Sequence, residues 1–163
     1  MTPSRAAGGR PAVAAPTPIH GDLDLSSFDC GNQDLNDWLR TAAARNDGLT
    51  ARTYVVCDGL KAAGFYCLAA GAVLRKELPT ARLRRNSPAQ IPVIVIGRLA
   101  VDLRYQNRGI GKGMLKEAIL RSVEASRTIG VRAILLHAID ERAIDFYLAN
   151  GFVASPIDRR TLI

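Results

Sequence analysis

A glycine-rich turn, Gln106-Asn107-Arg108-Gly109-Ile110-Gly111, stands between an apolar run and an amphipathic helical pattern. The glycines at 109 and 111 let the backbone approach an anion closely, because no side chain stands in the way. The first N–H groups of the following helix have no partner inside it, and the helix dipole adds positive charge there. The turn therefore predicts a phosphate site. The alternative is a plain glycine turn before an ordinary helix.

The residues around this turn predict an alternation of strands and helices. Residues 93–101 have the length and β-branched composition of a strand, and Gly97 inside this run indicates a bulge. The apolar pattern from Ile110 onward predicts a helix that Gly130 ends. A strand, a short helix and its capping exit are then expected at residues 131–138, 141–149 and 150–152.

The first half of the chain predicts a helix and a hairpin. Apolar residues at helical spacing follow the candidate cap Asn32, so an amphipathic helix is expected there. Two apolar runs, 52–57 and 62–70, are joined by the turn signal Asp58-Gly59 and predict an antiparallel hairpin. Residues 78–92 hold three prolines and a basic cluster, which predicts a loop or a short irregular helix.

Composition indicates one globular domain, since 163 residues with 48% apolar side chains can bury a core. Residues 1–18 are expected to be a disordered tail, and residues 19–163 the folded domain. No membrane span is expected, and prolines exclude the apolar core of a signal peptide. The three cysteines lack metal-ligand spacing and the two histidines are far apart, so we expect no metal site. The odd number of cysteines favours a reducing cytoplasm, with Cys57 and Cys67 as small buried side chains. We expect His137 to pack in the core.

Four segments occur in order between Phe28 and Ser155: FDCGNQDLNDWL, ARTYVV, IPVIVIGRLAVD and AIDFYLANGF. Together with the glycine turn, they resemble the GNAT N-acetyltransferases, and more closely the toxin branch that blocks translation by acetylating aminoacyl-tRNA. The resemblance implies an α/β (α+β) fold, a mixed central β-sheet flanked by helices and splayed at the acetyl-CoA site. It also implies acetyl-CoA as co-substrate, a homodimer, and a small ribbon-helix-helix antitoxin in a type II toxin-antitoxin pair.

The resemblance also assigns the cofactor site. The turn would hold the diphosphate, with mobile positive charge from Arg108 and Lys112, and the backbone of Leu99 and Val101 would pair with the pantetheine arm. The alternative for the side chains of Leu99 and Val101 is core packing. The candidate cofactor-binding residues are Leu99, Ala100, Val101, Gln106, Asn107, Arg108, Gly109, Ile110, Gly111, Lys112 and Gly113.

Acyl transfer from a thioester to an amine requires a neutral amine and a donor for the leaving sulfur. An α-amino group has a reference pKa of roughly 7.7 to 8.0, so a strong base is unnecessary, unlike for a lysine near 10.4. Tyr147 is the candidate catalytic acid, since the tyrosine of this short helix holds that place in the family pattern. The alternative is packing beside Phe146 and Phe152. Asp140 and Glu141 are expected to act at the helix end, and the alternative is a hydrogen bond to the cofactor or a role as water-mediated bases.

The positive charge is concentrated in one stretch of the chain. The net charge is +7, and residues 75–112 hold nine Lys or Arg against two acids. A polyanionic acceptor explains the part that is remote from the turn, and the alternative is a solvated loop. The candidate RNA-binding residues are Arg75, Lys76, Arg82, Arg84 and Arg85. Two other functions stay open: acetylation of a protein or small-molecule amine, and a nucleic-acid-binding module without catalysis.

Overall fold

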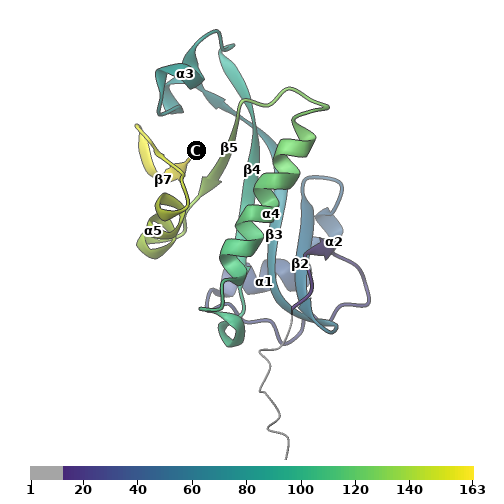
Figure 1. Ribbon diagram of the computed structural model, residues 1–163. Coiled ribbons are helices and arrows are strands. Elements are labelled where there is room, and N and C mark those ends of the chain that lie inside the picture. The colour runs from purple at the N-terminus through teal and green to yellow at the C-terminus, as the bar shows by residue number, and fades with distance from the viewer. Residues whose placement is uncertain (1–12) are drawn as a thin grey trace, which may run out of the picture.

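A computed structural model describes residues 13–163, which form a seven-stranded mixed sheet flanked by helices (Figure 1). The strand order across the sheet is β1-β2-β3-β4-β5-β7-β6. The strands are β1 (Thr17–Pro18), β2 (Arg52–Asp58), β3 (Lys61–Leu74), β4 (Gln90–Val101), β5 (Ala133–His137), β6 (Ala154–Ser155) and β7 (Asp158–Leu162). The helices are α1 (Gln33–Thr41), α2 (Ala43–Asn46), α3 (Ala81–Arg84), α4 (Ile110–Ala125) and α5 (Glu141–Ala149), with 3-10 turns η1 (Arg75–Glu77) and η2 (Leu103–Tyr105).

Strand β4 changes its pairing half-way along its length. Its first part pairs in parallel with β5, from Val93 opposite Ala133 to Ile96 opposite Leu136. Gly97 is the extra residue of a bulge against β3, as predicted, because Ile96 lies opposite Leu68 while Arg98 lies opposite Cys67. Beyond the bulge, β4 pairs with β3 alone among the described residues. The sheet is therefore splayed between β4 and β5, as the fold class implied.

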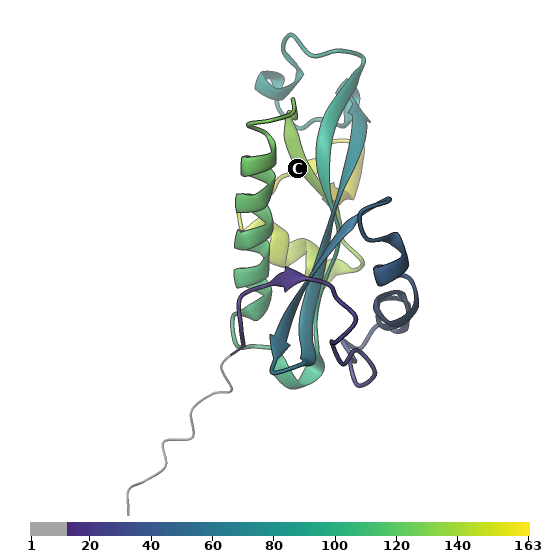
Figure 2. The ribbon, with the colours of Figure 1, turned by 90° about the vertical axis from the view of Figure 1, so that its right-hand side faces the viewer.

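Helices cover both faces of the sheet. Figure 2 shows α4 on one face and α1 with α2 on the other. The larger core lies under α4 and α5, where Met114, Leu136 and Tyr147 pack with the sheet. A second core lies under α1, where Leu39 meets the edge-to-face pair of Phe28 and Phe65. The splayed end of β4 thus lies between two separately packed layers.

Most of the predicted elements are confirmed, and the differences have local causes. The side chain of Asn32 caps α1, accepting the N–H of Leu35 at 3.0 Å, and α5 covers the predicted range 141–149. Helix α4 ends at Ala125 and not at Gly130, because turn hydrogen bonds such as Arg127 to Glu124 take over. Strand β7 was not predicted, since its sequence DRRTL lacks an apolar alternation.

Part of the expected N-terminal tail belongs to the sheet. Thr17 and Pro18, which the sequence placed in a disordered tail, pair with Val55 and Tyr54 of β2. Residues 1–12 of that expected tail lie outside the described residues. None of the helices in residues 13–163 is long and apolar enough to cross a membrane.

The predicted burial of Cys57 and Cys67 is confirmed, and the histidine prediction is wrong. Cys57 and Cys67 are buried on β2 and β3. His137 is exposed and not in the core, because β5 ends there beside β7 and the ring Nδ1 meets the hydroxyl of Thr161 at 3.0 Å. Within residues 13–163, no group of three His, Cys, Asp or Glu side chains is placed to hold a metal ion.

Candidate active site

The glycine turn forms the start of α4, as predicted. Gly109 caps the helix with φ of +81° and offers no side chain to its N–H groups. The first hydrogen bond of the helix runs from the N–H of Gly113 to the carbonyl of Gly109, at 3.0 Å. A Cβ added at Gly109 would meet nothing within 4 Å, so the space in front of the helix is open. Uncapped N–H groups facing open space suit the phosphates of acetyl-CoA.

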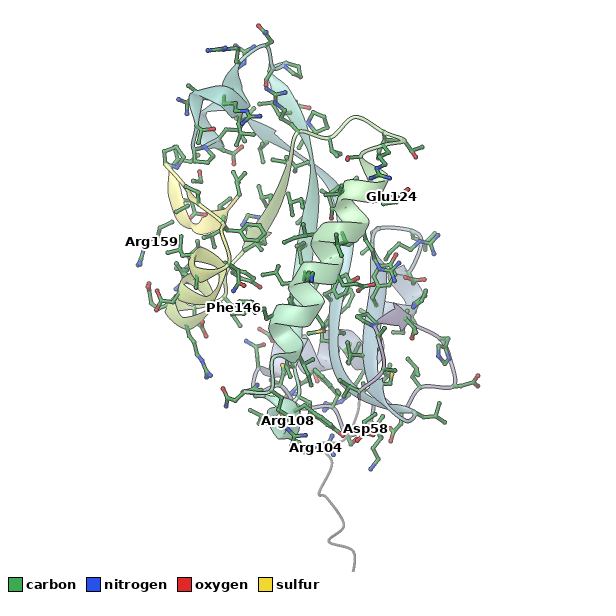
Figure 3. The ribbon with its side chains drawn as sticks, in the orientation of Figure 1. Asp58, Arg104, Arg108, Glu124, Phe146 and Arg159 are labelled. Atoms are coloured by element: carbon green, nitrogen blue, oxygen red, sulfur yellow. The ribbon has the colours of Figure 1, made fainter. Side chains whose placement is uncertain are left out.

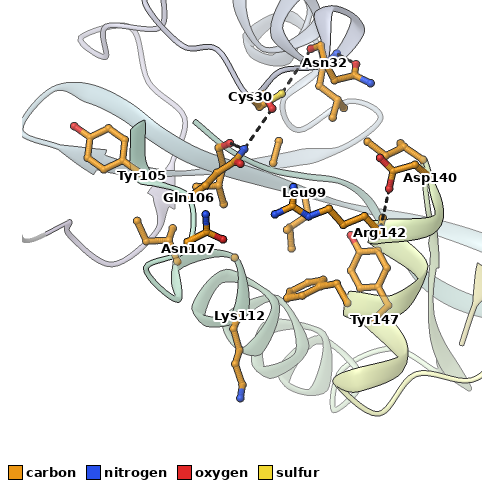
Figure 4. Close-up of a pocket in the computed structure, with 18 of the residues that line it drawn as sticks. Cys30, Asn32, Leu99, Tyr105, Gln106, Asn107, Lys112, Asp140, Arg142 and Tyr147 are labelled. Carbon is orange, nitrogen blue, oxygen red and sulfur yellow. Dashed lines mark hydrogen bonds between the residues drawn. The ribbon is translucent and has the colours of Figure 1, made fainter. Parts of the chain in front are cut away.

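A cavity of about 400 Å³ extends from this helix start (Figure 4). One wall is the splayed end of β4 with the turn, the second is α5 with the residues just before it, and the third is the segment before α1 with the first turn of α1. Of the predicted cofactor residues, the cavity is lined by Leu99, Ala100, Val101, Gln106, Asn107, Gly109, Ile110, Gly111 and Lys112. Arg108 and Gly113 do not line it, and the guanidinium of Arg108 lies over the ring of Tyr105, 5.4 Å from its centroid.

The side chain of Gln106 bridges two walls of the cavity. Its side-chain amide donates to the carbonyl of Val101 at 2.9 Å and to the carbonyl of Cys30 at 3.4 Å (Figure 4). These two carbonyls belong to segments that are far apart in the sequence, the end of β4 and the loop before α1. The Gln106 side chain therefore joins two walls of the cavity, and its predicted contact with the cofactor stays a prediction.

The ring of Tyr147 packs as the alternative expected, and its hydroxyl is left available for the predicted catalytic role. Its ring is buried, 7% exposed, and packs edge-to-face on Phe146 and Phe152 with centroids 5.2 and 6.0 Å away. Its hydroxyl makes no hydrogen bond within residues 13–163, and Tyr147 lines the cavity (Figure 4). Burial, with a smaller effect of the charge on Asp140, raises the pKa of Tyr147 to about 12. The phenol is therefore a protonated, uncommitted donor at neutral pH.

A buried carboxylate holds the wall before α1. Asp102 is 1% exposed and accepts the N–H of Asp29 at 3.0 Å and the guanidinium of Arg104 at 2.9 and 3.0 Å. Burial alone would raise the pKa of Asp102, but these hydrogen bonds outweigh it and hold the pKa below its usual range. Asn36 continues the network, since its amide oxygen accepts the N–H of Cys30 at 2.8 Å.

The wall before α1 was missed by sequence reasoning. It contributes Cys30, Asn32 and Leu35 to the cavity. The sequence predicts a helix start at Asn32 and a family segment around it, but nothing local in the sequence shows that this start faces α5. Asp140 is the N-cap of α5, as expected, and accepts the N–H of Ala143 at 2.8 Å.

The predicted RNA-binding residues lie around η1 and α3, at the opposite end of the molecule from the start of α4 (Figure 1). Figure 3 marks this start by Arg104 and Arg108. Two of the five are bound to backbone: Arg84 donates to the carbonyl of Leu78 at 2.7 Å, and Arg75 to that of Ser87. Lys76, Arg82 and Arg85 are exposed and form no ion pair within residues 13–163. RNA binding by this group stays a prediction.

Comparison with known proteins assigns this architecture. The profile of the acetyltransferase (GNAT) domain matches residues 49–154, which include the splayed strand, the glycine turn and Tyr147. The chain belongs to the GNAT acetyltransferase family, as the sequence motifs indicated.

The chain is also similar to individual proteins over most of its length. It is 42% identical over 146 residues to the tRNA-acetylating toxin of Mycobacterium tuberculosis (strain ATCC 25618 / H37Rv), covering 89% of this chain and 87% of that protein. The structure of AtaT complexed with acetyl-methionyl-tRNAfMet is 28% identical, with a TM-score of 0.84 and coverage of 91% and 92%. A tyrosine-to-phenylalanine mutant of AtaT, bound to the C-terminus of the antitoxin AtaR and to acetyl-CoA, is 26% identical, with a TM-score of 0.76 and coverage of 91% and 90%.

Proposed function

We propose that this chain is the toxin of a type II toxin-antitoxin pair, an acetyl-CoA-dependent enzyme that acetylates the α-amino group of aminoacyl-tRNA. The similarity to a tRNA-acetylating toxin and to AtaT with an acetylated tRNA supports this substrate. The observation that carries the chemistry is the single cavity that joins the uncapped start of α4 to the hydroxyl of Tyr147. A module that only binds nucleic acid would need neither feature.

Acetyl-CoA supplies the acetyl thioester, and the residues at the start of α4 would hold its phosphates. The N–H groups of Ile110 and Gly111 point along the helix axis toward the open space, and Lys112 adds a full positive charge. The free edge of β4 near Leu99 offers backbone groups to an extended amide chain, because β5 does not pair there. The carbonyl of Val101 is already bonded to Gln106, so this contact is shared.

Tyr147 would act on the leaving sulfur. Its raised pKa of about 12 keeps the hydroxyl protonated. A thiol has a pKa of about 8.5, so the phenol stabilises the developing thiolate by donating a hydrogen bond more readily than by giving up its proton. The proton that the amine loses after attack ends on the sulfur of the leaving group as free thiol, and the hydroxyl of Tyr147 would donate to that sulfur until the proton arrives.

The absence of a dedicated base is consistent with an α-amine acceptor. Asp140 is the carboxylate that lines the cavity in the described part of the chain, and it is committed to the start of α5. An α-amino group is partly neutral near pH 7, whereas a lysine side chain is almost entirely charged. A protein lysine is therefore a poorer acceptor for this cavity than an aminoacyl ester.

The proposal also covers the antitoxin, the oligomeric state, the location and the RNA contacts of this chain. Binding by an antitoxin is supported by the complex of AtaT with the C-terminus of AtaR. From the family resemblance and the charge pattern we also propose a ribbon-helix-helix antitoxin, a homodimer and RNA contacts of Lys76, Arg82 and Arg85. The cysteine pattern supports a cytoplasmic location.

The direct test is acetyl transfer from labelled acetyl-CoA to a panel of charged and uncharged tRNAs. We expect label on one or more charged tRNAs, none on uncharged tRNA, and loss of the label when the ester bond is hydrolysed by mild base. Label on protein lysines or polyamines, with none on any charged tRNA, would replace this substrate by another amine.

A further inference from the structure

The wall of the cavity formed by α5 carries a cation to which the proposed mechanism gives no role. Arg142 lies in the first turn of α5 and is exposed. It lines the cavity, and Figure 4 shows its side chain extending into the cavity toward Leu99. Among the cavity-lining residues that the structure describes, Lys112 and Arg142 carry positive charge. Lys112 belongs to the start of α4, so the two cations stand on separate helices.

Arg142 is not engaged by the protein. Within residues 13–163 it forms no ion pair and no side-chain hydrogen bond, although it is flanked by acids. Asp140 accepts the N–H of Ala143 at 2.8 Å, and Glu141 binds Arg159 through two contacts of 2.5 and 2.8 Å. Both neighbouring carboxylates therefore have other partners, and the guanidinium of Arg142 faces the cavity with its donors free.

The reacting groups give Arg142 nothing to bind. A thioester and a neutral amine carry no negative charge, and the phosphates of the donor are assigned to the start of α4. An amino acid esterified to the 3′ end of a nucleic acid does bring an anion, because the phosphodiester of the terminal nucleotide lies one ribose away from the ester. A guanidinium binds such a phosphate with two parallel hydrogen bonds.

We propose that Arg142 binds the terminal phosphodiester of the acceptor nucleic acid and thereby positions the α-amine beside Tyr147. This inference rests on the proposed function and names a specificity-determining residue for it. Free amino acids, polyamines and protein amines lack that phosphate, so Arg142 favours tRNA-linked amines over them. Charge-assisted hydrogen bonds of this kind change binding by about 10- to 100-fold.

The experiment compares Arg142→Gln with the wild-type enzyme on two acceptors. One is aminoacyl-tRNA, and the other is the matching aminoacyl-adenosine, which keeps amine, ester and ribose but has no phosphate. We expect Arg142→Gln to raise the KM for aminoacyl-tRNA by about 10- to 100-fold, with kcat and the KM for acetyl-CoA changed by less than about threefold. On aminoacyl-adenosine, kcat/KM should stay within about twofold of the wild-type value.

Two further variants separate the geometry of the Arg142 side chain from the effect of its charge. Arg142→Lys keeps the charge and loses the planar fork, so its KM should fall between those of Arg142→Gln and the wild type. Arg127→Gln removes the same charge at the far end of α4, where Arg127 pairs with the exposed Glu124 at 3.1 Å. This control should leave both acceptors unaffected, apart from any general effect of net charge on tRNA binding.

Three results would overturn the inference while leaving the proposed function intact. An equal loss on both acceptors would place Arg142 on the ester or the amino acid. A raised KM for acetyl-CoA would place it on the phosphates of the donor, and a fall in kcat at constant KM would place it on the reacting carbonyl. If the wild-type enzyme acetylates neither acceptor, the proposed function itself fails and this inference fails with it.

Discussion

Replacing Tyr147 by Phe removes one oxygen atom and leaves the aromatic packing of α5 in place. The ring contacts with Phe146 and Phe152 do not involve the hydroxyl, and no described residue bonds to it. The variant should therefore lose less than about 0.5 kcal/mol of stability, which is about 1 to 2 °C in Tm for a chain of this length. Its affinity for acetyl-CoA should stay within about threefold of the wild type, because we place the phosphates at the start of α4, away from the hydroxyl of Tyr147.

Catalysis should respond very differently. Removing a donor aimed at a charge that develops in the transition state lowers kcat by about 100- to 1000-fold, or about 2.7 to 4 kcal/mol. Steady-state release of the free thiol measures kcat, and calorimetry with acetyl-CoA measures the affinity of the same sample. A kcat within about threefold of the wild-type value would return Tyr147 to a packing role. An equal loss of cofactor affinity would show that the cavity had changed shape.

Three further perturbations test the site. Gly109→Asp should weaken acetyl-CoA binding by at least about 100-fold in calorimetry, because a negative charge would face the phosphates. Gly109→Asn has no charge and must adopt the same positive φ, so it should weaken binding by less than about 10-fold. Equal losses of affinity in the two variants would make backbone strain, and not charge, the cause. Asp102→Asn should lower the free energy of unfolding by about 2 kcal/mol at pH 7 in urea titrations, because Arg104 and the N–H of Asp29 lose an ionised acceptor. Since the pKa of Asp102 is held below its usual range, this contribution is present above about pH 4 and is lost as the pH falls through the lowered value, so the two proteins should converge in strong acid. The kcat/KM for aminoacyl-tRNA should be half-maximal at about pH 8 as the amine loses its proton, and level from about pH 9 to about pH 10 because the pKa of Tyr147 is about 12. An alkaline loss centred at about pH 9 would contradict this.

Local sequence signals predicted the elements that build the cofactor side of the site. The turn at Gly109, the bulge at Gly97 and the cap Asp140 each depend on a few adjacent residues, so their geometry follows from backbone rules. Tyr147 was predicted from the motif of its helix, and the structure adds that its ring packs while its hydroxyl has no hydrogen bond within residues 13–163.

The third wall of the cavity could not be predicted in this way. It depends on Asp102 accepting the N–H of Asp29, across 73 positions, and on Gln106 reaching the carbonyl of Cys30, across 76. Pairings at such separations leave no periodic pattern in the sequence. Counting charges also could not distinguish Arg84, which binds a backbone carbonyl, from Arg82, which is exposed.

The splay between β4 and β5 has a kinetic consequence. Helix α4 begins on one face of the sheet and α1 on the other, and the cavity touches both (Figure 2). The acetyl-CoA that we propose at the start of α4 and the acceptor that we propose beside Arg142 would contact different walls of one cavity, so both can be bound at once. We expect random-order binding through a ternary complex, with intersecting lines in double-reciprocal plots and no acetylated enzyme along the way.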